Sequence, residues 1–197
     1  MTINLALARA RAQRSFASAP GVFRPAILDQ PTPPLGRVLV ELGLVNRETA
    51  EEAVGAAHEL GRSLGDVLLE RDLISETQLA QAIAARSGLP YVDLDVFPAD
   101  PDVARLIGLA PALRYRAIPI ALDADGALVV AIADPEEAPA LSDIAVIVKA
   151  EVRAAVATTS AIEALIASLP EERHQAAGPA GDRLAAALAR TRTRSAV

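Results

Sequence analysis

Several residue types are absent or scarce in this chain, and each absence excludes a class of chemistry. Cysteine and tryptophan do not occur, and aromatic residues make up only 3% of the 197 positions. Without cysteine there can be no disulfide, thiol nucleophile or cysteine-ligated metal, and this composition is typical of a reducing compartment such as the cytoplasm. With so few aromatic residues, the core must consist of Ala, Leu, Val and Ile.

Basic residues are also too few for several functions. The formal net charge is −6, which argues against a nucleic-acid partner because phosphate binding needs a basic surface. Lys149 is the only lysine and follows no glycine-rich loop, so a phosphate-binding P-loop is excluded. No apolar run reaches the roughly 18 residues of a membrane span, so we expect no direct membrane span.

One block of sequence occurs twice, 29 positions apart. Residues 35–45 (LGRVLVELGLV) return as residues 64–74 (LGDVLLERDLI), with six positions identical. Asn46 follows the first copy and Ser75 the second, each at a place typical of a helix N-cap, and Gln78 completes a capping box with Ser75. A repeat of this length indicates a duplicated helix pair, so we predict four short helices around one core. On the second of them we expect an inner face of Ala50, Ala53, Val54 and Ala57.

The hydrophobic period changes after Gly88. Residues 91–96 alternate like a strand, and Asp100 or Asp102 starts a short helix. Two apolar runs, 117–122 and 127–132, flank Asp123-Ala124-Asp125-Gly126 and predict a hairpin. We further expect a helix over 138–148, a strand over 151–157 and a final helix to Leu169, capped by Thr159 or Ser160.

These patterns predict an α+β fold: a tandem-repeat four-helix subdomain followed by a small α/β subdomain, with flexible termini. We expect a flexible leader over residues 1–33, the helical subdomain over 34–88, the α/β subdomain over 89–169, and a mostly disordered tail over 170–197.

Several separated motifs resemble one known module. They are the two L-G-x-x-L blocks, residues 88–94 (GLPYVDL), residues 114–120 (RYRAIPI) and residues 130–135 (VAIADP). Together they resemble the MshEN domain, the N-terminal domain of type II secretion and type IV pilus assembly ATPases of bacteria, over residues 35–169. The resemblance implies a protein partner in a secretion-like or pilus-like membrane apparatus. The ATPase half that usually follows is absent from this sequence, so we expect a stand-alone module that is cytoplasmic and peripheral to a membrane complex.

The resemblance also implies a possible ligand, because the tandem block binds cyclic di-GMP in some members of that family. Arg precedes Leu-Gly in each copy of such members and Gln ends it, whereas this chain has Pro34 and Ser63, then Ala57 and Arg86, at those positions. At the position of Gly43 in the first copy, the second copy has Asp72. Its negative charge would lie near the anionic ligand and repel it. If the ligand binds, we expect its contacts among Leu35, Gly36, Arg37, Leu39, Gly43, Arg62, Leu64, Gly65, Leu68 and Arg86. The alternative is that the repeats serve only as core, and the altered positions favour it.

No catalytic set of residues can be assembled from the sequence. Asp93, Asp95, Asp100 and Asp102 lack the spacing of a calcium loop, and we expect no metal site. We therefore predict a non-enzymatic adaptor without a cofactor, with a cyclic di-GMP sensor as the alternative.

Overall fold

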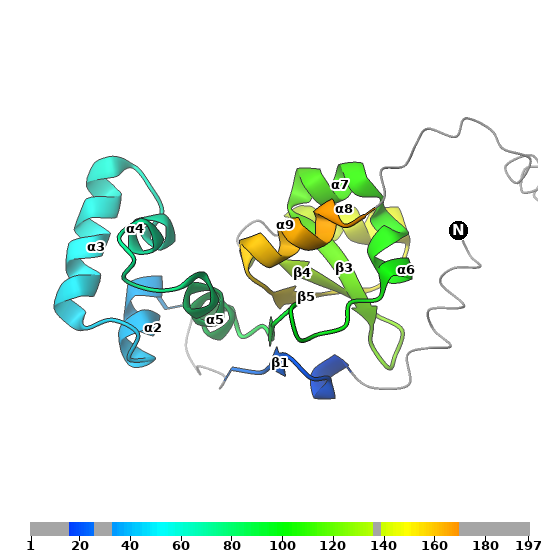
Figure 1. Ribbon diagram of the computed structural model, residues 1–197, viewed down its shortest axis with the longest axis horizontal. Coiled ribbons are helices and arrows are strands. Elements are labelled where there is room, and N and C mark those ends of the chain that lie inside the picture. Colours follow the sequence, from blue (N-terminus) through cyan, green and yellow to red (C-terminus); the bar gives the residue numbers. More distant parts are fainter. Residues whose placement is uncertain (1–15, 26–32, 136–138, 170–197) are drawn as a thin grey trace, which may run out of the picture.

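The computed structural model describes residues 16–25, 33–135 and 139–169, and Figure 1 shows two subdomains side by side. The predictions for residues 1–15, 26–32, 136–138 and 170–197, including the tail, lie outside the described residues. The α+β fold with a helical repeat followed by an α/β unit is confirmed.

The helical subdomain consists of four helices with the predicted caps. They are α2 (Leu35–Glu41), α3 (Arg47–Leu60), α4 (Leu64–Glu70) and α5 (Glu76–Ser87). The Asn46 side chain accepts a hydrogen bond from the Thr49 amide at 2.8 Å, and Ser75 and Gln78 form the reciprocal capping box. These side chains satisfy helix amides that have no partner within the helix.

The two copies share the same turn after their first helix. The Leu44 amide donates to the Leu39 carbonyl and the Leu73 amide to the Leu68 carbonyl, both at 2.9 Å. This is the Schellman pattern, which needs a left-handed residue in between. Gly43 supplies it with φ +68°, and Asp72 adopts the same conformation with φ +52°.

The helices enclose a core of their own. Its centre is formed by Val38, Leu39, Val67 and Leu68, which are almost fully buried, with Ala53, Ala57 and Ala82 against them. The predicted inner face of α3 is correct for Ala50, Ala53 and Ala57. It is wrong for Val54, which is 49% exposed because it borders a hollow between α2 and α3.

The α/β subdomain is built on a five-stranded mixed sheet in the order β1-β2-β5-β4-β3. The strands are β1 (Val22–Phe23), β2 (Tyr91–Val92), β3 (Ala117–Leu122), β4 (Leu128–Ile132) and β5 (Val152–Val156). β2, β5 and β4 run parallel, while β1 and β3 are antiparallel to their neighbours.

Short helices surround this sheet. They are η1 (Phe16–Ser18), α6 (Pro101–Ala104), η2 (Arg105–Ile107), α7 (Leu109–Tyr115), α8 (Pro139–Val148) and α9 (Thr159–Ala167). In Figure 1, α7 and α9 lie together beside β3, while α5 of the helical subdomain stands next to β2 and β5. The hairpin between β3 and β4 turns at Gly126 with φ +85°, as predicted.

Three details differ from the predictions. β2 ends at Val92 rather than Val96, because the Asp93 carbonyl turns to accept the amides of Val96 and Phe97. Thr158, not Thr159 or Ser160, caps α9 by accepting from the Ala161 amide.

The third difference concerns the predicted leader. Residues Phe16–Ser18 and Val22–Phe23 join the fold, so the prediction of a flexible segment is wrong for them. Phe16 packs edge-on against Phe97, Phe23 stacks on Tyr91, and β1 pairs with β2. Among the described helices, none combines the length and the apolar character that crossing a bilayer requires.

Candidate functional site

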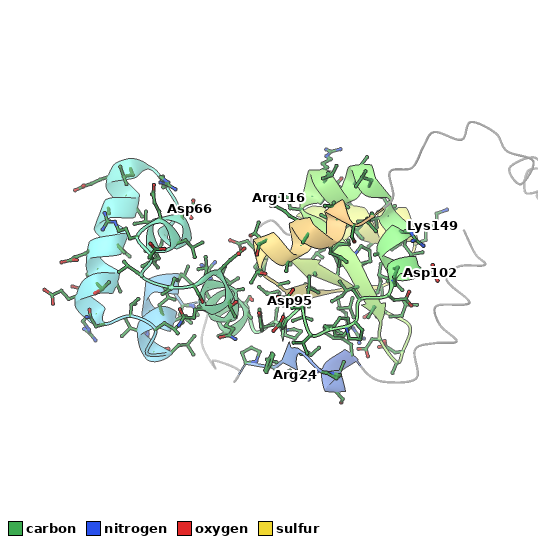
Figure 2. The ribbon with its side chains drawn as sticks, in the orientation of Figure 1. Arg24, Asp66, Asp95, Asp102, Arg116 and Lys149 are labelled. Atoms are coloured by element: carbon green, nitrogen blue, oxygen red, sulfur yellow. The ribbon has the colours of Figure 1, made fainter. Side chains whose placement is uncertain are left out.

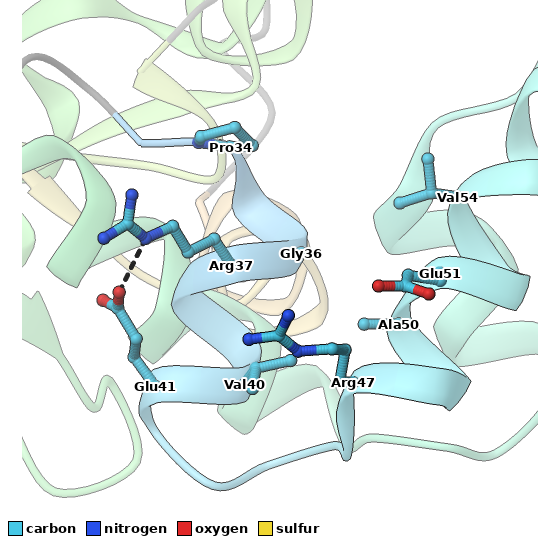
Figure 3. A pocket seen from close by; sticks show the side chains of 9 residues that line it. All are labelled: Pro34, Gly36, Arg37, Val40, Glu41, Arg47, Ala50, Glu51 and Val54. Carbon is cyan, nitrogen blue, oxygen red and sulfur yellow. Dashed lines mark hydrogen bonds and ion pairs between the residues drawn. The ribbon is translucent and has the colours of Figure 1, made fainter.

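A hollow of about 660 Å³ lies on the first copy of the repeat, between α2 and α3. Its lining comprises Pro34, Gly36, Arg37, Val40, Glu41, Arg47, Ala50, Glu51 and Val54. In Figure 3, Arg47, Glu51 and Val54 project from α3 towards α2, while Arg37 and Glu41 extend together along α2. The Arg37 Nε donates to Glu41 at 2.8 Å, so this arginine is already paired.

The structure brings together only some of the ten residues that the sequence analysis proposed for cyclic di-GMP. Gly36 and Arg37 line the hollow. Leu39 and Leu68 are fully buried core residues, and Leu35 and Leu64 pack against the same core. Gly43 is exposed at the turn, and Arg62 is held by Glu70 on α4. Gly65 lies under Leu79, and Arg86 lies near the end of α5. None of these last four lines the hollow.

Sequence reasoning missed the contribution of α3 to this hollow. Arg47, Ala50, Glu51 and Val54 are spaced i, i+3, i+4 and i+7, which places them on one face of a helix. That spacing shows that the four residues share a face of α3, but not that the face borders a hollow. The apolar character of Ala50 and Val54 instead predicts that both face the core, which holds for Ala50 but not for Val54.

The second copy carries different side chains at the equivalent positions. Shifting the lining by 29 residues replaces Arg37 with Asp66 (labelled in Figure 2) and Arg47 with Glu76. Ala50 becomes Leu79, whose Cδ2 atom lies 3.0 Å from the position of a Cβ on Gly65. The second copy therefore has acidic residues where the first has arginines, and a leucine fills the space over its glycine.

In the second copy, the helix face equivalent to the one that lines the hollow packs against the α/β subdomain. Ala80 and Ile83 of α5 pack with Tyr91 of β2 and Val156 of β5 in one cluster. The Glu76 carboxylate accepts hydrogen bonds from the Ser160 amide at 2.8 Å and from the Ser160 hydroxyl at 2.6 Å. The face that is open on α3 is thus the face by which α5 joins the α/β subdomain.

A network of ionisable groups ties the leader residues to the hairpin. Asp123 accepts from the Phe16 amide at 3.1 Å and pairs with Arg153 at 2.9 Å, and Arg153 also contacts Asp125 and Glu151. Burial alone raises the pKa of Asp123, but hydrogen bonds from Ala124, Phe16 and Arg153 outweigh it and leave that pKa below its usual value. This arrangement is structural, because the carboxylate is fully engaged.

Acidic side chains form no metal centre in the part of the chain that the structure describes. Asp93 accepts from the Asp95 amide and Asp100 from the Asp102 amide, so these carboxylates shape turns and caps.

Comparison with known proteins identifies the module. Residues 87–176 match the MshEN domain. The chain is 38% identical over 111 residues to the type IV pilus assembly ATPase PilB of Thermus thermophilus, covering 56% of this chain and 12% of PilB. It is also 31% identical over 96 residues to bacteriophage adsorption protein B of Escherichia coli K12, covering 49% of this chain and 13% of that protein. The chain spans only a small part of the curated relatives it matches.

Solved structures extend the similarity across both subdomains. A structure of MshE with cdg (cyclic di-GMP) superimposes with a TM-score of 0.61 at 29% identity, over 70% of this chain and 99% of that one. The N-terminal domain of XpsE gives a TM-score of 0.51 at 26% identity, over 68% of this chain and 91% of that one.

The predicted resemblance is therefore confirmed. Residues 87–176 of this chain match the MshEN domain, and the chain is homologous to the N-terminal domains of the PilB, MshE and XpsE ATPases. These comparisons point to no enzyme family for the part of the chain that they cover.

Proposed function

We propose that this chain is a non-enzymatic interaction module, an adaptor that binds a protein of a secretion-like or pilus-like membrane apparatus on its cytoplasmic side. The observation that carries the proposal is the exposure of large apolar side chains on the helical subdomain. Leu42, Val54, Leu60 and Leu73 are 48%, 49%, 60% and 38% exposed. Large apolar side chains that remain exposed on a helical surface are candidates for contact with a protein.

The similarity to domains of pilus and secretion ATPases supports the kind of partner. The described side chains also offer no nucleophile, base and orienting group within reach of one another. A binding role therefore fits the geometry better than catalysis does.

The experiment is a quantitative recovery of the tagged full chain from its native cells after mild cross-linking. One variant carries Leu42→Ser, Val54→Ser and Leu73→Ser, and the matched control carries Val96→Ser and Val146→Ser on the α/β subdomain. We expect one apparatus component to be enriched by the wild type and the control and lost with the first variant. Equal recovery by all three proteins, or no enriched component, would overturn the proposal.

A second candidate function is cyclic di-GMP binding. The specific observation in its favour is the similarity to MshE with cdg over nearly all of that chain, together with a hollow on the first copy. The charges argue against tight binding. Arg37 is paired with Glu41, Glu51 also lines the hollow, and the second copy has Asp66 and Glu76 at the equivalent positions. We therefore rank the adaptor first.

A further inference from the structure

The two copies of the repeat have equivalent helix faces, one covered by the rest of the fold and one exposed. On α5 the face made by Glu76, Ala80, Ile83 and Ala84 is covered by residues of β2, β5 and the start of α9. On α3 the equivalent residues are Arg47, Glu51, Val54 and Gly55, and all four are exposed.

The contacts that cover α5 indicate what such a helix face can bind. Ala80 and Ala84 are small, so Tyr91 and Val156 can approach α5 closely and bury themselves against it. The duplicated face on α3 has the same helical spacing and keeps an apolar residue, Val54, at the position of Ile83. Its neighbour in the described chain is α2, and the hollow between α2 and α3 leaves Arg47, Glu51 and Val54 accessible (Figure 3).

Gly55 is a second, independent observation. It lies in the middle of a 14-residue helix, where glycine is unfavourable, and its backbone is not left-handed. A Cβ at this position would meet nothing within 4 Å. Packing among the described residues therefore gives no reason for glycine here, whereas the close approach of another backbone would.

Charge indicates the chemistry of the partner. On the second copy, Glu76 accepts hydrogen bonds from the amide and the hydroxyl of Ser160, two donor groups at the start of α9. On the first copy, Arg47 stands at that position and can only donate. The group that meets it must therefore be an acceptor, and a carboxylate gives the stronger, charge-assisted bond.

We infer that the Arg47–Glu51–Val54–Gly55 face of α3 docks a protein segment that brings a large apolar or aromatic side chain against Val54 and Gly55 and a carboxylate to Arg47. This inference rests on the proposed function and specifies its contact surface.

The test places the photo-cross-linking residue p-benzoylphenylalanine at His58, which is exposed one turn beyond Val54, in the full chain in its native cells. We expect an adduct whose cross-linked peptide contains an aromatic or large aliphatic residue and an Asp or Glu close to it. Gly55→Leu and Arg47→Glu should each lower the adduct yield at least fivefold, whereas Arg47→Lys should retain most of it. Glu52→Gln, on the neighbouring solvent side of α3, is the matched control and should change nothing.

A stability measurement separates docking from folding. Gly55→Ala should raise the melting temperature of the free protein, because alanine favours the helix and meets no neighbour, yet lower the adduct yield. An adduct that is insensitive to Gly55→Leu, one with a basic peptide, or one within the same chain would overturn the inference. Adducts from probes at Leu42 or Leu73 but not at His58 would overturn it and leave the adaptor standing. No adduct from any of these positions would overturn both.

Discussion

Glu76 and Ser160, 84 residues apart in the sequence, join the two subdomains through a single carboxylate. Glu76 lies in the first turn of α5 and accepts both the amide and the hydroxyl of Ser160 in the first turn of α9. The carboxylate therefore lies near the positive ends of two helices, where a negative charge is favourable. The link supplements the small apolar cluster of Ala80, Ala84, Tyr91 and Val156.

Glu76→Ala should lower the free energy of unfolding by about 1–2 kcal/mol, since it removes an N-terminal cap from another subdomain and leaves a helix amide without its partner. Urea denaturation checks this. Glu76→Gln should cost less, because its amide oxygen still accepts one bond. Glu48→Ala, in the exposed first turn of α3, is the control. A loss no greater for Glu76→Ala than for Glu48→Ala would show that the link is not stabilising.

The Asp123 network predicts a loss of stability in acid. Because its hydrogen bonds hold the pKa of Asp123 below the usual value of 3.8, the folded state favours the charged form. That stabilisation is present above the unfolded pKa and is lost as the pH falls through the lower folded pKa. Asp123→Asn should therefore be less stable than the wild type at pH 7, while the difference should shrink progressively below roughly pH 4. Thermal unfolding of both proteins across this range is the measurement, and a constant difference would contradict the account.

The turn shared by the two copies predicts opposite effects of exchanging glycine at equivalent sites. Gly43→Ala should destabilise the protein by about 1 kcal/mol, because a side chain at φ +68° is strained. Asp72→Gly should stabilise it by about 0.5 kcal/mol. The strain of a side chain at φ +52° is removed, and this gain in free energy exceeds the cost of the extra conformational entropy of glycine in the unfolded chain. Chemical denaturation of both variants tests this. Two changes of the same sign would mean that the copies do not share one turn.

Local signals predicted local structure well. Asn46 and Ser75 could be recognised as caps, and Gly126 as the turn of the hairpin, because each acts on residues within four positions. The end of β2 was missed because the alternation of residue types continues to Val96, although the Asp93 carbonyl accepts the amides of Val96 and Phe97 and closes a turn there.

Long-range contacts decided the rest. Nothing near residue 16 in the sequence shows that Phe16 meets Phe97 and Asp123. The repeat revealed two equivalent helix faces, but only the structure shows that Tyr91 and Val156 cover α5 and leave Val54 on α3 exposed. The exposed face could not be distinguished from core by periodicity alone.

Placing arginine at Pro34 and Ser63 changes the residues that precede α2 and α4, so its effect on the helix caps has to be included. Pro34 makes no side-chain cap, so Pro34→Arg should be tolerated. Ser63 accepts from the Asp66 amide at 3.0 Å, so Ser63→Arg should cost about 1 kcal/mol of stability. The double variant should bind cyclic di-GMP more tightly than the wild type if the repeat retains a groove. Calorimetry checks this beside an unfolding curve, and an unchanged affinity in a folded double variant would mean that the groove is lost.

Titration of the wild-type chain with cyclic di-GMP distinguishes a domain that binds a protein from one that binds this nucleotide. Each missing charge-assisted contact removes about 1.5–3 kcal/mol, so losing two weakens binding by roughly a hundredfold or more. Isothermal titration calorimetry at micromolar protein should show weak binding or none. A saturable isotherm with submicromolar affinity would instead show that the chain is a cyclic di-GMP sensor.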